Sequence, residues 1–398
     1  MLEGKCVLLG VTGSIAAYKA AALASALVKQ KADVHILMTQ NATQFISPIT
    51  FETLTNHKVP LDTFDRNFEF HVEHVSLGKK ADLVIVAPAT ANIIAKLAYG
   101  IADDMLSTTI LACQCPLLIA PAMNTRMYEN PVTQDNLERL KKYGWHVITP
   151  AAGRLACGDT GTGKMPEPEI LLEEALFWAC KKDLSGLRIL VTAGPTQEAL
   201  DPVRYLTNHS SGKMGYAIAQ AAARRGAEVT LISGPTALKV PAHVKQIPVT
   251  SAEDMFQAVA SQFENQDIII KAAAVADYRP AQTSDQKIKK KDGDSRLELC
   301  RTKDILGWLG EHRKSGQFLC GFSMETENLI ENSRAKLARK RVDMIAANHL
   351  FTPGAGFQTD TNVLTLITQS EEIPLPQMSK EKAANCLLDE ILKRYQQP

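Results

Sequence analysis

This sequence has almost no excess of charge of either sign, few aromatic side chains and no long apolar run. Its 44 basic residues face 43 acidic ones, for a net charge of +1, so no overall field favours nucleic acid or acidic membrane surfaces. Aromatic residues make up 6% of the chain, and no stretch of about 18 apolar residues indicates a membrane-spanning helix. We therefore expect small molecules and other copies of the chain as partners, and neither nucleic acid nor membrane.

Paired cysteines and a leader-like start are also missing. The eight cysteines are scattered without a CxxC pair, which is typical of reduced thiols. No basic segment followed by an apolar run opens the chain. Residues 10–16 have their glycines at the wrong spacing for the GxGxxG dinucleotide motif, so a mononucleotide fits better than NAD. These observations predict a cytoplasmic enzyme or binding protein.

The alternation of β-rich and helical segments along the chain predicts an α/β fold. Short β-rich runs alternate with amphipathic helical segments in both halves, which is the pattern of a mainly parallel sheet covered on both faces. A Gly-rich segment over 151–166 is too long for a turn and is interpreted as a functional flap. A linker near 182–187 separates two doubly wound, Rossmann-like units, 1–183 and 184–398. Strands are predicted at 7–10, 33–38, 82–87, 116–120, 146–149, 188–192, 228–233, 267–274, 317–322, 342–347 and 363–367, and helices at 15–30, 91–99, 133–143, 167–182, 213–225, 251–263, 328–340 and 380–395.

The segment 204–215 has the composition of an anion cradle. Asn208 can donate from its amide and Ser210 and Ser211 from hydroxyls, while Gly212 lets backbone N–H groups approach an anion. An Ala-rich helix is predicted from Lys213 onward, so the loop opens onto the positive end of a helix dipole. Taken alone, the same residues could also form an ordinary helix cap.

Several motifs of the first half lie at 10–19, at His74, at 87–92, 103–108 and 121–124 with Met127, and at 156–161. Together they resemble the flavin-dependent cysteine decarboxylases. The resemblance implies that FMN is bound, with its phosphate on the first Gly-rich turn, at Gly13 and Ser14, and on hydroxyls. Thr39, Ser107 and Thr108 are the hydroxyl candidates, although Ser107 and Thr108 could instead cap a helix.

A cysteine carboxylate has no nearby electron sink, so oxidation of the carbon that bears sulfur must precede loss of carbon dioxide. The resemblance assigns this oxidation to FMN and the final protonation of carbon to Cys157 on the Gly-rich flap. It makes His74 the catalytic histidine and implies that Asn124 grips the substrate carboxylate, with Met127 in the substrate pocket. A lone histidine or cysteine is more often structural, and Asn124 could cap the next helix.

The motifs of the second half lie at 192–196, 201–205, 208–215, 272–278, 287–290 and 321–325. Together they resemble the bacterial, CTP-using phosphopantothenate-cysteine ligases. It implies an acyl cytidylate made from CTP and then attacked by the amine of cysteine, with Mg2+ sharing the charge. The residues implied are Lys287 as catalytic lysine, Asn208 and Arg204 on the acyl substrate, Lys289 with its neighbour Lys290, Phe322, Lys340 and Asn348 at the nucleotide, and Asp277 as nucleotide or Mg2+ ligand.

Several simpler alternatives stay open in this half and in the chain as a whole. The basic run from Lys287 could be a solvated loop, and Asp277 could cap a turn. Lys303 stands where many relatives have proline, which puts the nucleotide contact of Asp304 in doubt. A non-catalytic flavin-binding protein of the same fold is the rival to a two-activity enzyme of coenzyme A synthesis.

The resemblance also implies trimers of the first unit and dimers of the second, which together would build a dodecamer.

Overall fold

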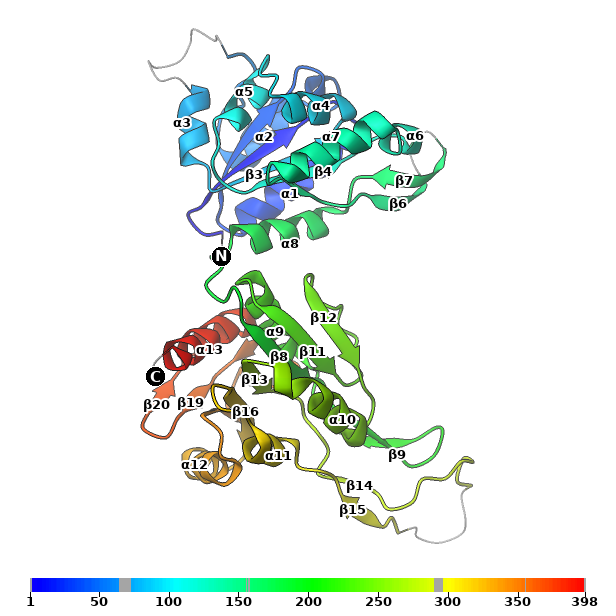
Figure 1. Ribbon diagram of the computed structural model, residues 1–398, viewed down its shortest axis with the longest axis vertical. Coiled ribbons are helices and arrows are strands. Elements are labelled where there is room, and N and C mark those ends of the chain that lie inside the picture. Colours follow the sequence, from blue (N-terminus) through cyan, green and yellow to red (C-terminus); the bar gives the residue numbers. More distant parts are fainter. Residues whose placement is uncertain are drawn as a thin grey trace. The chain divides into compact units, whose positions relative to one another are not determined.

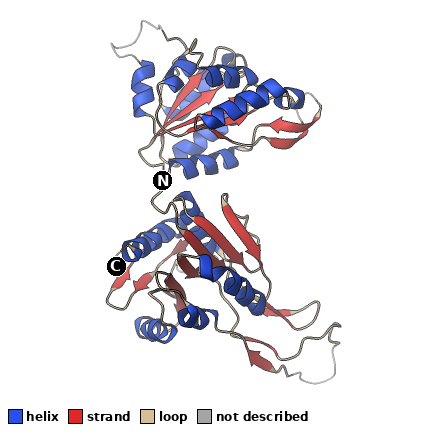
Figure 2. Cartoon of the chain, in the orientation of Figure 1, coloured by secondary structure: helices blue, strands red, loops and turns tan. Residues whose placement is uncertain are grey.

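The computed structural model describes residues 2–63, 73–154, 156, 158–289, 296–354 and 356–396. The chain divides into two compact units, Met1–Cys180 and Lys181–Pro398. In each of them, strands form a central sheet with helices on both sides, as Figures 1 and 2 show. We describe each unit by itself.

The first unit is built on a five-stranded parallel sheet in the order β2-β1-β3-β4-β5. Successive side chains of β1 serve opposite faces: Val7 and Leu9 belong to one core cluster and Leu8 belongs to the other. All six residues of β1 are buried, which explains why its sequence is apolar throughout rather than alternating. The strands are β1 (Cys6–Val11), β2 (Asp33–Met38), β3 (Leu83–Ala89), β4 (Leu117–Pro121) and β5 (His146–Val147).

Helices cover both faces of this sheet. One core contains side chains from α1 (Ala17–Lys29), α2 (Pro48–Thr55) and α8 (Pro168–Ala179). The opposite core contains side chains from α3 (Glu73–Lys80), α4 (Ala91–Tyr99), α5 (Met105–Leu111) and α7 (Pro131–Lys142). Two short helices complete the unit, η1 (Ala42–Gln44) and α6 (Thr125–Tyr128). The predicted Gly-rich flap includes an antiparallel hairpin of β6 (Ala151–Arg154) and β7 (Thr160–Lys164).

The second unit has an eight-stranded sheet in the order β12-β11-β8-β13-β16-β17-β19-β20. The first six strands in that order run parallel to one another. Strand β19 pairs antiparallel with β17, and β20 pairs antiparallel with β19. The predicted strand at 363–367 is β19, which begins two residues later, at Thr365. The bounds are β8 (Arg188–Ala193), β11 (Glu228–Ser233), β12 (Val244–Pro248), β13 (Ile268–Lys271), β16 (Phe318–Glu325), β17 (Met344–His349), β19 (Thr365–Ile367) and β20 (Glu372–Pro374).

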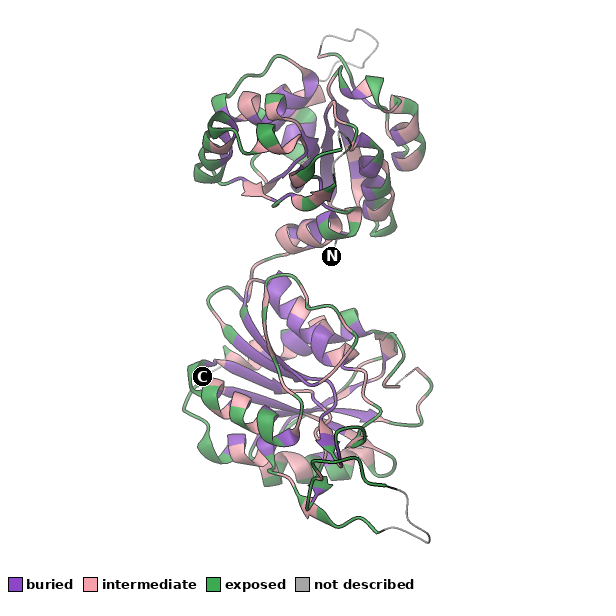
Figure 3. Ribbon diagram, turned by 90° about the vertical axis from the view of Figure 1, so that its right-hand side faces the viewer, coloured by how far each residue is buried: buried purple, intermediate pink, exposed green. Residues whose placement is uncertain are grey.

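Two helices, α9 (Lys213–Arg224) and α13 (Lys380–Tyr395), pack on one face of this sheet. The helices α10 (Ala252–Gln262), α11 (Ile305–His312) and α12 (Leu329–Lys340) pack on the other, with η2 (Phe263–Asn265). The buried colouring of Figure 3 runs through the strands of both units. The predicted doubly wound α/β fold is thus confirmed. Three small antiparallel pairs lie outside the sheet: β9 (Gln197–Ala199) with β10 (Tyr205–Thr207), β14 (Tyr278–Pro280) with β15 (Leu299–Arg301), and β18 (Thr361–Asn362) with β21 (Met378–Ser379).

In the described part of the chain, no helix combines the length and the apolar character that a bilayer crossing requires.

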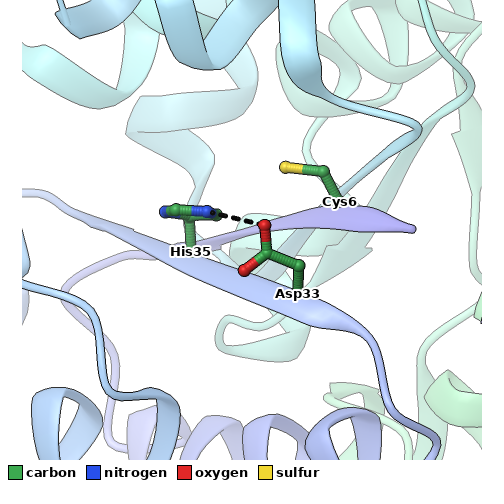
Figure 4. Close-up of side chains that lie close together, drawn as sticks. All are labelled: Cys6, Asp33 and His35. Atoms are coloured by element: carbon green, nitrogen blue, oxygen red, sulfur yellow. Dashed lines mark hydrogen bonds and ion pairs between the residues drawn. The ribbon is translucent and has the colours of Figure 1, made fainter. Parts of the chain in front are cut away.

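A polar cluster lies where β1 and β2 begin, at the opposite edge of the sheet from the strand ends that bind ligands in such folds (Figure 4). Asp33 accepts hydrogen bonds from Lys80 Nζ (2.6 Å), His57 Nε2 (2.6 Å) and His35 Nε2 (3.3 Å). Ligand atoms of Cys6, Asp33 and His35 lie within 4.8 Å of one another, a grouping that could hold a metal ion. Because the ammonium of Lys80 already neutralises this carboxylate, we assign the cluster a structural role.

The half-buried Asp33 should contribute stability that depends on pH. Burial raises the pKa of this carboxyl, but the hydrogen bonds from Lys80 and His57 outweigh burial and hold the pKa well below its usual value. A lowered folded-state pKa adds stability above the unfolded pKa of about 3.9, and this stability is lost as the pH falls. Asp33→Asn should therefore destabilise the protein by about 1 to 2 kcal/mol at neutral pH, and by progressively less below about pH 4.

Urea unfolding of the full chain, followed by tryptophan fluorescence at several pH values, measures this effect. The matched control is Asp135→Asn, because Asp135 is an exposed carboxylate of the same unit. Equal effects of the two substitutions, or an Asp33→Asn effect that does not shrink in acid, would contradict the assignment.

Candidate active sites

In the first unit, the loops after the parallel strands meet at one edge of the sheet. The turn after β1, with Gly13 and Ser14, packs against the turn after β2, since a Cβ atom at Gly13 would lie 2.7 Å from Asn41 Cβ. The amide of Thr39 donates to the carbonyl of Val11 (3.1 Å), which places this residue beside the same turn. Three predicted phosphate contacts, Gly13, Ser14 and Thr39, are thus brought together.

Two hydroxyls at this edge are buried without a partner. Among the described residues, Thr39 Oγ1 and Thr125 Oγ1 have no hydrogen-bond partner, although the solvent does not reach them. An orphaned buried hydroxyl costs free energy unless a ligand satisfies it. Thr39 therefore fits a site for an anionic group. Thr125 was not predicted from the sequence. The structure places it beside Gly161 of the hairpin, because a Cβ at Gly161 would lie 2.5 Å from Thr125 Oγ1.

A cavity of about 390 Å³ opens beside the first Gly-rich turn. Its lining includes Ser14, Asn124 at the end of β4, and Arg154 and Ala156 of the hairpin segment. The cavity wall thus combines a predicted phosphate contact with the predicted carboxylate-binding amide. Cys157, the predicted proton donor, lies outside the described residues, between the exposed Ala156 and Gly158. Met127 lies on α6 and is half exposed.

Asn124 caps α6, which is the alternative that its position after a strand left open. Its Oδ1 accepts from the amide of Arg126 (2.8 Å). Its Nδ2 donates to Asp159 (3.0 Å), which joins the end of β4 to the hairpin segment. Capping and substrate binding do not exclude each other here, because the two functions use different atoms of the amide.

The other three predicted residues of this unit lie apart from that cavity. The Ser107 hydroxyl, in the first turn of α5, bonds to Asp104 in a capping box (2.8 Å). Thr108 Oγ1 donates to the carbonyl of Ala102 (3.3 Å). Both hydroxyls are therefore engaged near the start of their own helix. His74 is half-buried in the first turn of α3.

The second unit has a cavity of about 620 Å³, which we call the basic cavity. Its lining includes residues of β13, β14, β15, β16, α11 and α12, with six basic and three acidic side chains. Such an excess attracts a polyanion. Asp277, Phe322 and Lys340, three of the predicted nucleotide contacts, all lie in this wall. The basic residues are Lys271, Arg301, Lys303, Lys336, Arg339 and Lys340, and the acidic ones are Asp277, Asp304 and Glu325.

A second cavity, of about 420 Å³, contains the predicted anion cradle, and we call it the cradle cavity. Asn208, Ser210, Ser211 and Gly212 line it. Gly212 has φ +78°, and a Cβ there would lie 2.8 Å from Thr236 Cγ2, so glycine is required immediately before α9. Asn208 Nδ2 donates to the carbonyl of Ala274 (3.0 Å), which orients the amide along the wall.

The two cavities share a wall. Lys271, Val275, Asp277, Phe322 and Lys336 line both of them. Asn348, a weaker candidate of the sequence, is buried at the end of β17 and lines the cradle cavity only. A nucleotide in one cavity and an acyl group in the other would therefore meet at these shared residues. Lys271 and Lys336 were missed from the sequence, although a lysine that ends the apolar run 268–270 is a signal that could have been noticed.

Lys340 and Lys303 already have partners. Lys340 forms an ion pair with Asp304, whose carboxylate also caps α11. Lys303, the departure from the family pattern, pairs with Glu253 (2.8 Å) and lies 4.3 Å from the centre of the Phe256 ring. Its charge is thus held on the side of α10.

Lys287 and Lys289 lie on the long connection between β14 and β15, are exposed, and are absent from the described lining of both cavities. Lys290 lies outside the described residues. The connection is tied to the segment before the anion cradle through the buried carboxylate of Asp201. This carboxylate accepts from the amide of Ile288 (3.1 Å) and pairs with Arg204, whose guanidinium also donates to the carbonyl of Ile288 (3.0 Å).

Two family models divide the chain at the same place as the structure. The model described as Flavoprotein matches residues 1–177, and the model of the DNA/pantothenate metabolism flavoprotein C-terminal domain matches residues 184–395. Fold and sites together thus define a flavoprotein of pantothenate metabolism, with two α/β units in one chain.

Curated relatives narrow this class. The "Coenzyme A biosynthesis bifunctional protein CoaBC" of Bacillus subtilis (strain 168) is 48% identical over 98% of this chain and 97% of its own length. The protein of the same name from Escherichia coli (strain K12) is 44% identical over 99% of this chain and 98% of its own. The chain belongs to this CoaBC family, and it is a bifunctional coenzyme A biosynthesis enzyme with decarboxylase and ligase activities.

Solved structures resemble the two units separately. The C-terminal domain of a coenzyme A biosynthesis bifunctional protein CoaBC is 44% identical, covers 55% of this chain and 100% of its own, and has a TM-score of 0.48. An FMN-dependent cysteine decarboxylase, SpaF, is 33% identical, covers 41% of this chain and 92% of its own, and has a TM-score of 0.37.

The Asp201 network should restrain the connection that holds Lys287. Asp201→Asn removes the charge that pairs with Arg204, so the connection should open more often and trypsin should cut at Lys287 and Lys289 several-fold faster. Timed proteolysis with mass spectrometry locates and times these cuts. Asp285→Asn is the matched control, because Asp285 is an exposed carboxylate on the same connection. Identical cleavage rates in both variants would exclude a restraining role of Asp201.

Proposed function

We propose that residues 184–398 join cysteine to 4'-phosphopantothenate through an acyl cytidylate made from CTP, and that residues 1–183 decarboxylate the product to 4'-phosphopantetheine with FMN. The observation that carries the ligase half is the shared wall of the basic and cradle cavities, because acyl activation requires a nucleotide and a carboxylate to meet. The names of the relatives and the family resemblance of the motifs support the same assignment.

Residues at the strand ends of the first unit fit an FMN phosphate. Thr39 Oγ1 supplies a buried donor without another partner among the described residues, and the turn at Gly13 and Ser14 supplies close backbone. When bound, FMN would accept a hydride from the carbon next to sulfur and later return it. Ser107 and Thr108 remain candidates by resemblance only.

The chain's own side chains would bind and protonate the substrate in this unit. Asn124, in the cavity wall and fixed by its bond to Asp159, is proposed to bind the carboxylate that leaves as carbon dioxide, with Met127 nearby on α6. Cys157 is proposed to deliver the proton to carbon, and His74 to act on the substrate during oxidation and decarboxylation. Closure of the hairpin segment would exclude water from the reacting atoms.

In the second unit, charge neutralisation is the main catalytic task. The net positive lining of the basic cavity would bind the triphosphate, with Asp277 as ligand for Mg2+ and Phe322 and Lys340 at the nucleotide. The cradle of Asn208, Ser210, Ser211 and Gly212 would hold the acyl substrate. Lys287 and Lys289 are exposed, so their proposed action on the phosphates requires the connection between β14 and β15 to move toward the cavity. Arg204 would bind substrate only if it left Asp201.

The proposed role of Thr39 predicts a change in FMN affinity. Thr39→Val keeps the shape of the side chain and removes the donor, so FMN should dissociate about tenfold more readily. Flavin fluorescence during dilution or dialysis of the holoenzyme measures this. Thr43→Val is the matched control, because the Thr43 hydroxyl donates to the carbonyl of Gln40 within its own turn. Unchanged FMN affinity in Thr39→Val would remove Thr39 from the phosphate site.

The two half-reactions should be separable by substitution. Purified protein with phosphopantothenate, cysteine, CTP and Mg2+ should yield phosphopantetheine by mass spectrometry. Lys287→Gln should abolish ligation but still decarboxylate added phosphopantothenoylcysteine, because the basic charge is needed only at the phosphates. Cys157→Ser should ligate normally and accumulate a decarboxylated product that still carries a carbon–carbon double bond, because the final proton is missing.

Lys239→Gln, at an exposed lysine of the same unit, is the control for loss of charge alone. Normal ligation by Lys287→Gln, or normal phosphopantetheine output from Cys157→Ser, would refute the corresponding assignment.

A further inference from the structure

Lys271 occupies an unusual position for a lysine. It is the last residue of β13, a strand with neighbours on both sides, and the three residues before it, 268–270, are almost completely buried. Its register partners are Thr192 on β8 and Gly321 on β16. Because side chains alternate along a strand, Lys271 shares a face with Ile269, which packs in the core under α11 and α12. The ammonium therefore emerges from a hydrophobic layer into the shared wall.

The shared wall contains two basic side chains, Lys271 and Lys336, and among the described residues only Lys336 has a hydrogen-bond partner. Lys336 Nζ donates to the carbonyl of Phe322 (2.9 Å) and approaches Ser323 Oγ (3.4 Å). Lys340, one turn further along α12, is paired with Asp304. For Lys271, neither a hydrogen bond nor an ion pair is found within the described part of the chain. A partly buried cation without a partner is costly, and a bound anion would remove that cost.

The charges around Lys271 favour loss of its proton in the absence of a ligand. The pKa of this lysine is lowered to about 8 in total: burial is the largest cause, the charges of Lys336 and Lys340 also lower it, and the charge of Asp277 opposes them. Burial also lowers the pKa values of Lys336 and Lys340. The remaining charged groups of the two cavities are Arg301, Lys303, Asp304, Glu325, Arg339, Lys213 and Lys380, so the surroundings are positive on balance.

We propose that Lys271 is an anion-binding residue of the ligase reaction, which contacts the phosphoryl group that joins nucleotide and acyl group and takes up a proton as this group arrives. The inference rests on the proposed CTP-dependent function and adds to it one phosphate-binding residue, Lys271, and the uptake of one proton on binding. The position is decisive, since the anhydride between a nucleotide in the basic cavity and an acyl group in the cradle cavity must cross the wall that Lys271 lines. An approaching phosphate favours the charged amine, so binding and protonation are linked.

The linkage has a defined sign. At about pH 7 the free amine is already mostly protonated, and CTP should bind with little proton uptake. At about pH 9 it is mostly neutral, and binding should take up close to one proton, with an affinity that falls about tenfold per pH unit. The triphosphate itself is fully ionised at this pH and contributes no proton.

Titration calorimetry of the full-length holoenzyme with CTP and Mg2+, in buffers of different ionisation enthalpy, measures the number of protons directly. Phosphopantothenate and cysteine are omitted so that no turnover occurs. Lys271→Met should weaken CTP binding about 10- to 100-fold at pH 7. Lys271→Arg, which keeps a permanent charge, should bind CTP within a few-fold of the wild-type protein and show no proton uptake at pH 9.

Lys336→Arg is the matched control and should retain the uptake, because the Lys336 ammonium is already held by Phe322. Uptake that persists in Lys271→Arg, or that disappears in Lys336→Arg instead, would overturn the assignment while leaving the proposed function intact. A wild-type protein that binds CTP without any uptake at pH 9 would also overturn it. Failure of the wild-type protein to bind CTP at all would instead overturn the proposed function, and this inference with it.

Discussion

One constraint limits where polar groups can lie in this protein: in a parallel sheet covered on both faces, the central strands have no solvent-exposed side chains along their length. In β1 every residue is buried, and β13 is buried until its last residue. Ionisable side chains of the central strands therefore lie near strand ends, and the carboxyl ends of parallel strands share an edge. Thr39 directly follows β2, Asn124 lies three residues after the end of β4, and Lys271 is the last residue of β13.

Much of the fold could be predicted from the sequence, because the buried strands are short, almost purely apolar runs separated by amphipathic helices. The predicted strand at 33–38 has the same bounds as β2, and the helix at 380–395 has those of α13. The family resemblance is likewise confirmed by relatives that match nearly the full length. Of the residues predicted from motifs, Asp277, Phe322 and Lys340 share a cavity because their motifs follow or lie on neighbouring elements of one sheet and its covering helices.

Other features depend on contacts that a single sequence does not contain. The helix cap of Ser107 was one of two alternatives that its local sequence allowed, but nothing near Arg204 in the chain predicts that it shares Asp201 with Ile288, which is far away in sequence. The position of Lys271 at the end of an apolar run is visible in the sequence, but its closeness to Lys336 and Lys340 of α12 is not. Ion pairs between distant segments and the surroundings of a charge are tertiary properties, so local pattern leaves them open.

The Asp201 carboxylate has a kinetic consequence. It binds the backbone of the loop before the cradle at Val203 and Arg204 (both 2.9 Å) and also the backbone at Ile288. Lys287 directly precedes Ile288, whose backbone is hydrogen-bonded to Asp201 in the segment before the cradle. Lys287 therefore cannot move far unless Ile288 moves as well. If Lys287 acts on the phosphates as proposed, its movement toward the cavity must therefore either break the Asp201 bond to Ile288 or move the backbone at Val203 and Arg204 with it.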